Sequence, residues 1–149
     1  LGLLGGRPES VKPLTDIYWE AAREAGHDVS KLRVSVTGHS YIAQTGEQAM
    51  TEFVSHYNQY MGYFSKDRGI PYFYTTAEQL MPQRAPGQIL AVGSAEELAE
   101  KILYQHELFG HSRFMGQFDM GGQPLARVEK AIDLLANKVA PIVRRALSK

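Results

Sequence analysis

One short pattern recurs along this chain: an apolar, strand-like run, then glycine, then the start of a helix. It occurs in residues 1–4 before Gly5 and Gly6, in residues 34–37 before Gly38, and in residues 114–118 before Gly121 and Gly122. Strands that alternate with helices are typical of a parallel sheet covered by helices. The sequence therefore predicts an α/β fold with parallel strands.

Composition narrows the class of protein. The chain has 149 residues, of which 44% are hydrophobic and 21% are charged, as in an ordinary globular domain. Lys plus Arg and Asp plus Glu number 16 each, so no net charge attracts nucleic acid or an anionic membrane. There is no Cys, which excludes disulfides and thiolate chemistry. No apolar run approaches the roughly 18 residues of a membrane span. We expect a cytoplasmic protein.

The first half of the chain predicts a strand, a helix, a strand and a helix. Helical spacing of apolar residues predicts a helix over about 8–25 that ends at Gly26. Pro13 moves its expected start a little later than Pro8, with Ser10 as the cap. The β-branched run from 32 to 37 predicts a strand that continues to 42. Thr45 followed by Gln48 is a capping-box pattern and predicts a helix that lasts to about 64.

The second half begins with residues 65–88, which are rich in aromatic residues, Gly and Pro, and include a short helix near 75–80. A connection this long is typical of a lid, and its aromatic content favours an ordered one. A short strand follows at 89–93, then a helix capped by Ser94 and Glu97 that ends at Gly110. A last strand at 114–118 precedes a helix from Pro124, which Pro141 should kink or divide.

Candidate binding residues follow the predicted strands, because ligands of parallel α/β proteins bind beyond the carboxyl ends of the strands. At the first end, Gly5 and Gly6 allow close backbone approach and Arg7 adds a bidentate donor. The alternative is that these glycines only make a turn, and Glu9 weighs against a phosphate site there. At the last strand, Gln117 presents a polar group toward the mouth or lies on a half-buried strand face.

His39 is the best catalytic candidate. It sits at a strand end and is followed by Ser40 and Tyr41, where a proton donor or a substrate hydrogen bond would be useful. The alternative is a histidine satisfied by a neighbouring carbonyl. The spacing of His, Asp and Glu resembles no metal site, and the chain carries no Walker, Rossmann or nucleophile-elbow motif.

Three stretches carry a resemblance that extends over nearly all of the chain. They are Gly5-Gly6-x-Pro8-Glu9 with Pro13-Leu14 and Tyr18, then Val92-Gly93-Ser94-x-Glu96-Glu97 with Ala99-Glu100-Lys101-Ile102, and finally Ala131-Ile132-Asp133-Leu134-Leu135 with Val139-Ala140-Pro141. In these residues the chain resembles the bacterial-luciferase-like flavin-dependent monooxygenases.

The resemblance implies a (β/α)8 TIM barrel, of which this chain would hold about three βα units, strands six to eight. It implies flavin mononucleotide (FMN) as cofactor, or coenzyme F420 in one branch, used to activate oxygen or to move a hydride to or from a small organic substrate. Gly5, Gly6, His39 and Gln117 align with strand ends that face the mouth, and residues 65–88 with the segment that covers it.

Three βα units cannot close a barrel, so the outer strands would present unpaired edges. We expect the chain to pair with the missing amino-terminal half of the barrel or to form a homo-oligomer, with no nucleic-acid or membrane partner. The alternative to an enzyme is a fragment without activity that serves as an assembly module.

Overall fold

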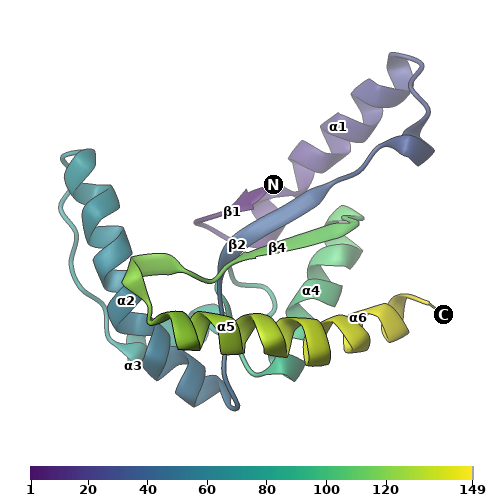
Figure 1. Cartoon of the computed structure of the whole chain (residues 1–149). Coiled ribbons are helices and arrows are strands. Elements are labelled where there is room, and N and C mark those ends of the chain that lie inside the picture. The colour runs from purple at the N-terminus through teal and green to yellow at the C-terminus, as the bar shows by residue number, and fades with distance from the viewer. Residues whose placement is uncertain (149) are drawn as a thin grey trace.

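The structure is a computed structural model that describes residues 1–148, and it contains a sheet of four parallel strands. The strands are β1 (Gly2–Leu3), β2 (Ser35–Ile42), β3 (Ala91–Gly93) and β4 (Arg113–Gln117). The long strand β2 pairs with the other three, and Figure 1 shows β4 running beside it. The predicted α/β class and the parallel direction of the strands are confirmed.

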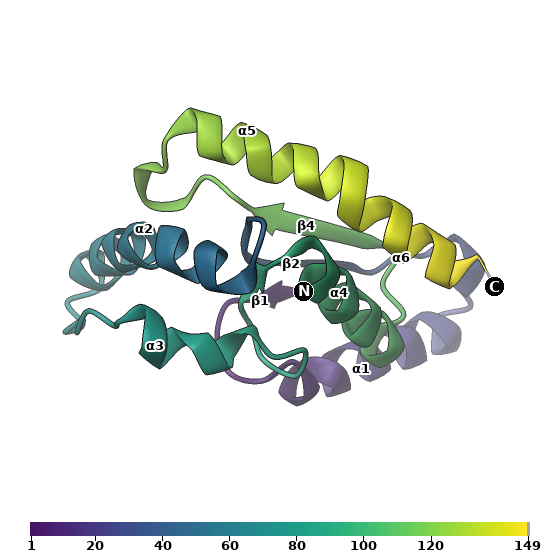
Figure 2. The same ribbon diagram turned by 90° about the horizontal axis from the view of Figure 1, so that it is seen from below.

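Six helices accompany the strands: α1 (Lys12–Glu24), α2 (Gly46–Asp67), α3 (Ala77–Leu80), α4 (Ala95–Phe109), α5 (Leu125–Leu134) and α6 (Ala140–Leu147). In Figure 2, α1, α4 and the α5–α6 pair lie side by side over one face of the sheet, with α4 in the middle. Helix α2 stands apart from this layer, beyond the carboxyl ends of the strands (Figure 1).

Helix α1 begins later than Pro8, as Pro13 had indicated. Pro8–Val11 form a single 3-10 turn, and the α-helix starts at Lys12 with Pro13 in its first turn, where a missing N–H costs nothing. Ser10 is not the cap, because its hydroxyl donates back to the carbonyl oxygen of Arg7. The helix stops where predicted, since Gly26 has a φ of 74°.

The other helix ends follow their sequence signals closely. Ser94 and Glu97 form a complete capping box at the start of α4, and Gly110 ends that helix with a φ of 62°. The hydroxyl of Thr45 accepts from the backbone N–H of Gln48 at the start of α2. Before Pro141 the last helix passes through a π-helical turn, Leu135–Val139, which divides α5 from α6 as predicted.

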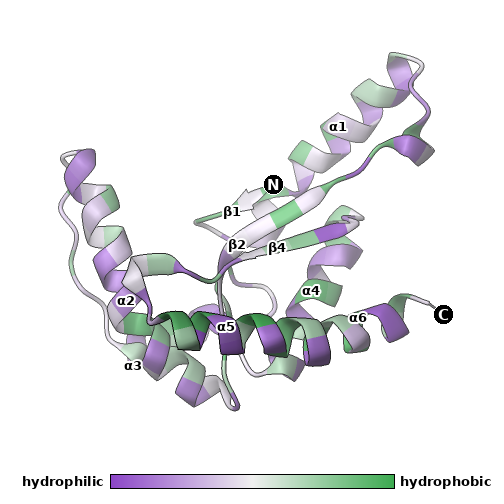
Figure 3. Cartoon of the chain, in the orientation of Figure 1, coloured by the Kyte–Doolittle hydropathy of each residue, from purple (hydrophilic) through white to green (hydrophobic). Residues whose placement is uncertain are grey.

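The main core lies between β2, β3 and the helices. It contains Tyr41 of β2, Phe53 of α2, Leu98 of α4 and Val128 of α5, all buried. Burying each large apolar side chain contributes about 1.5–3 kcal/mol, so this cluster stabilises the fold most. In Figure 3 hydrophobic and hydrophilic residues alternate along α5 and α6, as expected of helices with one buried face.

The opposite face of the sheet is largely open. Side chains alternate along a strand, so Val36 packs with Leu3 of β1 and Phe109 of α4, whereas Thr37 and its register partner Met115 point the other way. Met115 is 45% exposed and Leu4, just after β1, is 53% exposed. Near His39, α2 covers this face.

The predicted lid region forms an ordered return beside α2. After α2 ends at Asp67, the chain runs without regular structure to Thr76, and Thr76 and Gln79 then form a capping box at the start of α3. The short helix predicted here is therefore confirmed. Within residues 1–148 no helix combines the length and apolar character that a membrane crossing requires.

Candidate functional site

The sheet register brings three of the predicted site residues to one edge. Leu3 at the end of β1 pairs with Gly38, and Gln117 at the end of β4 pairs with His39. Gly5 follows β1 after one residue, and Gly6 turns the chain with a φ of 76°. Gly5, His39 and Gln117 therefore lie at the level where two parallel strands end.

The sequence analysis placed His39 at the end of its strand, but the structure does not. Strand β2 continues for three further residues to Ile42, because its last part gains a new partner in β3. The prediction is thus wrong for β2 taken alone, although His39 does mark the ends of the flanking strands β1 and β4.

The imidazole of His39 is buried. The residue is 3% exposed, and neither ring nitrogen has a partner among residues 1–148. The rings of Tyr57 and Tyr60 lie edge-on to it at 5.3–5.7 Å between centroids. Burial lowers the pKa of His39, because the charged form loses its hydration. A neutral imidazole offers one donor and one acceptor, and no group of the described chain pairs with either.

Gln117 extends this polar group. It is half-buried on β4, beside His39 in register, and its amide makes no hydrogen bond within the part of the chain that the structure describes. Two glycines close to Gln117 in the sequence, Gly116 and Gly121, allow close packing of the chain here. A Cβ on Gly116 would meet the ring of Phe118, and one on Gly121 would overlap the backbone oxygen of His56 in α2.

Arg7 is not brought to this group. Its guanidinium lies 3.5 Å from the carboxylate of Glu9, which also accepts a hydrogen bond from the hydroxyl of Tyr104 in α4. That hydrogen bond, together with Arg7, lowers the pKa of Glu9. Glu9 therefore holds Arg7 toward Tyr104 of α4.

Asn58 of α2 is a structural residue that the sequence analysis missed. It is 7% exposed, and its amide donates to the carbonyl oxygen of Thr75 at 2.8 Å. Its Oδ1 accepts from Tyr72 and from both the backbone N–H and the hydroxyl of Thr75. One side chain thus fixes the return segment to α2. A single Asn on a helix gives no sequence signal for this role.

Lys101 of α4 is the second missed residue. It is 1% exposed, and its ammonium donates to the backbone oxygens of Ala85 and Gln88. Burial lowers its pKa to about 8. Lys101 therefore ties the end of the return segment to α4, as Asn58 ties its middle to α2.

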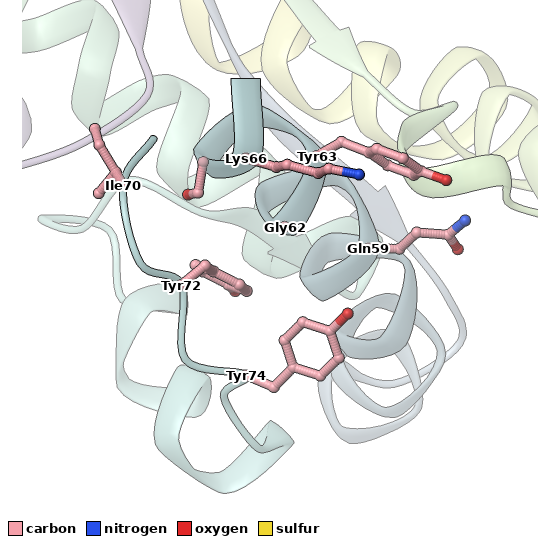
Figure 4. Close-up of a pocket in the computed structure, with 8 residues that line it drawn as sticks. Gln59, Gly62, Tyr63, Lys66, Ile70, Tyr72 and Tyr74 are labelled. Carbon is pink, nitrogen blue, oxygen red and sulfur yellow. The ribbon is translucent and has the colours of Figure 1, made fainter. Parts of the chain in front are cut away.

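Two cavities open on the carboxyl side of the sheet. One, of about 380 Å³, lies between α2 and the turn after β4, and Tyr60, Tyr63 and Gly121 are among its lining residues. The other, of about 420 Å³, lies between α2 and the return segment (Figure 4). Among residues 1–148 no three His, Asp or Glu side chains gather as metal ligands.

Solved structures confirm the fold. The monooxygenase RslO1 from Streptomyces bottropensis superposes with a TM-score of 0.68 at 18% identity, over 94% of this chain and 40% of that one. The oxygenating constituent of 3,6-diketocamphane monooxygenase from the CAM plasmid of Pseudomonas putida, solved in complex with FMN, gives 0.61 at 23% identity, over 94% and 42%.

A third similar structure is the coenzyme F420 dependent tetrahydromethanopterin reductase from Methanopyrus kandleri, with a TM-score of 0.58 at 17% identity, over 94% of this chain and 44% of that one. The chain thus spans about two fifths of the length of these proteins. The α/β fold with a parallel sheet is similar to that of luciferase-like TIM barrels.

Sequence comparison gives the family. Among proteins of curated function none matches the chain. The family model for luciferase-like monooxygenases, however, matches residues 1–112, which include β1 to β3 and all of α4. This match covers most of the chain and agrees with the resemblance in the sequence. The chain therefore belongs to the luciferase-like monooxygenase family.

Proposed function

We propose that this chain is the carboxyl-terminal part of a flavin-dependent oxidoreductase, with strands six to eight of a (β/α)8 barrel. Three facts support this: the family match, the parallel strands, and the coverage of 94% of this chain against 40–44% of the similar structures. The cofactor is FMN, which a similar protein binds, with coenzyme F420 as the alternative.

The residues at the carboxyl edge fit a flavin ring. The observation that carries the proposal is the buried imidazole of His39, whose two nitrogens have no partner among residues 1–148, next to the amide of Gln117. Buried polar groups without partners cost about 1–3 kcal/mol each, so an arrangement of this kind indicates a ligand that supplies hydrogen bonds. The rim of a flavin offers donors and acceptors of this type.

A bound flavin supplies the redox chemistry, whether oxygen activation or hydride transfer. The residues of this chain do the rest. His39 stays neutral at physiological pH because burial lowers its pKa, so it can donate through one nitrogen and accept through the other. Gln117 adds an amide, and Gly5 and Gly6 expose backbone N–H groups. Tyr57 and Tyr60 exclude water from His39.

Flavin titration tests the proposal. We expect the fluorescence of FMN to be quenched in a saturable way, with micromolar affinity, and coenzyme F420 to be compared in parallel. His39→Phe should weaken binding by about tenfold, the equivalent of about 1.4 kcal/mol. His27→Phe, at an exposed site after α1, is the matched control. If neither cofactor binds, or both variants bind as the wild type does, the proposal fails.

The open face and edges of the sheet also support a partner, for which we propose the amino-terminal half of the barrel. Leu4 and Met115 are exposed on that face, and Leu14 and Ile17 are exposed on α1. In the alternative, a second copy covers these surfaces and the chain is an assembly module without activity. Light scattering after size exclusion separates these cases: a stable homo-oligomer that binds no flavin favours the module.

A further inference from the structure

Another cavity lies at the opposite edge of the sheet, on the face that the helices cover. Its volume is about 650 Å³, larger than that of either cavity at the carboxyl edge. Its lining comes from α4, from residues 111–114 at the start of β4, and from the last helix between Leu135 and Ser148. In Figure 2 α6 runs beside α4, so both walls of the cavity belong to this chain rather than to the proposed amino-terminal half.

The floor of this cavity is apolar. Ile102 of α4 and Val139 of the π-helical turn are buried there, and Phe114, Leu135 and Val143 are half-buried around them. A lining of this kind offers water no hydrogen bonds, so it favours an apolar occupant. The volume lies within the range of about 300–1,000 Å³ that is typical of ligand pockets. The floor therefore suits the hydrocarbon part of a ligand.

The π-helical turn shapes one wall of the cavity. Leu135 and Val139 are its first and last residues, and Ala140, directly after it, also lines the cavity. Turns of this type are rare and lie frequently at functional sites. Because the side chain of Ala140 is only a methyl group, a larger side chain at this position would extend into the cavity.

The charges at the rim of the cavity have one sign. Its lining contains Arg113 of β4 and Arg144 of α6, and no Asp or Glu. Neither arginine forms a salt bridge within residues 1–148. A guanidinium group can bind a carboxylate through two parallel hydrogen bonds. The rim therefore suits an anionic head group above the apolar floor.

His106 adds a polar group whose orientation is already fixed. It is half-buried, and its Nδ1 lies 2.7 Å from the carbonyl oxygen of His111. A carbonyl oxygen only accepts, so Nδ1 carries the proton and Nε2 is the acceptor of the neutral ring. The buried ring of His111 lies edge-on to that of His106, 5.6 Å away between centroids. An apolar floor beneath two arginines and an oriented imidazole suits an amphipathic acid.

We propose that this cavity binds an aliphatic carboxylic acid, with its chain on the apolar floor and its carboxylate at the rim, toward Arg113 and Arg144. The charge of the rim selects an acid over a neutral alcohol of the same length. The site goes beyond the proposed function and does not depend on it. It lies at the amino ends of the strands, whereas His39 and Gln117 lie where β1 and β4 end.

Calorimetry with decanoate as the probe, below the concentration at which it forms micelles, tests the site on the full chain. We expect saturable binding, weakened by about tenfold or more in Ala140→Leu, whose side chain fills the cavity. Ala136→Leu, at an exposed position of the same turn outside the lining, is the matched control and should bind as the wild type does. Arg144→Gln should weaken binding roughly fivefold, whereas Arg145→Gln, next to it but outside the lining, should not.

Comparison ligands show which part of the probe is recognised. Decan-1-ol, which lacks the charge, and butyrate, which lacks most of the chain, should each bind more weakly than decanoate. Arg144→Gln changes an exposed side chain, so its effect can be measured even where Ala140→Leu folds poorly. Decanoate binding that depends on Arg144 upholds the site whether or not the chain binds FMN.

Three results overturn the inference. The first is unsaturable binding of decanoate, and the second is a loss of affinity that is equal in Arg144→Gln and Arg145→Gln, because charge alone then explains the attraction. The third is an oligomer, detected by light scattering, that binds no decanoate and that Ala140→Leu dissociates. In that case the cavity is an interface between copies of the chain.

Discussion

Lys101 gives the chain a pH-dependent stability whose sign can be worked out from the structure. Its ammonium is buried against two backbone carbonyls, and no carboxylate among residues 1–148 forms a salt bridge with it. Burial lowers its pKa from 10.5 to about 8 in the folded chain. Between these values the unfolded chain binds the proton and the folded chain does not. Stability therefore rises as the pH increases from about 8 toward 10.5.

The size of this effect follows from the pKa values. A difference of about 2.5 units corresponds to about 3.4 kcal/mol in the free energy of unfolding, at about 1.4 kcal/mol per unit. Between pH 7 and 9.5 the folded chain loses the proton while the unfolded chain largely keeps it, and Lys101 alone adds about 2 kcal/mol.

The assay compares the wild type with Lys101→Met, which keeps the length of the side chain and removes the ionisable group. Urea unfolding at pH 7, 8, 9 and 9.5 should show the wild type gaining about 2 kcal/mol over the variant across this range. The neutral amine retains two hydrogens for Ala85 and Gln88, so deprotonation need not break these bonds. Lys31→Met, at an exposed site, should show no such trend. A constant difference between wild type and Lys101→Met would refute the reasoning.

Two further substitutions, Gly121→Ala and Asn58→Ala, test the packing of α2, and each has a control variant. Gly121→Ala should destabilise the chain by about 2–4 kcal/mol, because it combines a φ of 63° with a clash against α2. Gly122→Ala shares a positive φ but meets open space, so denaturation should show a loss of only about 1–2 kcal/mol, and equal losses would contradict this account. Asn58→Ala should speed amide exchange at Thr75, whereas Asn137→Ala, with only a surface bond, should not; unchanged protection of Thr75 would exclude the anchoring role.

Local signals in the sequence were enough to predict most of the elements. The Ser94–Glu97 capping box and Gly110 fix α4 at both ends, because each acts within one helical turn. Pro141 likewise predicted the division of the last helix, because proline acts on the turn that precedes it. Pro13 indicated that α1 begins later than Pro8, but the cap predicted at Ser10 was wrong, because this hydroxyl donates back to Arg7 in a 3-10 turn.

The site was less predictable because its properties come from contacts between distant residues. His39 could be placed near strand ends, but its burial depends on Tyr57 and Tyr60, which come from the following helix, α2. Arg7 was expected at the mouth, yet Glu9 and Tyr104, the latter far along the chain, draw it to α4.

Titration of isotope-labelled chain with reduced FMN, followed by amide chemical shifts, tests the central claim most directly. The account predicts saturable shift changes concentrated at Gly5, Gly6, His39 and Gln117, where parallel strands end beside one another. Spectra that do not change, or changes confined to the amino ends of the strands, would contradict it.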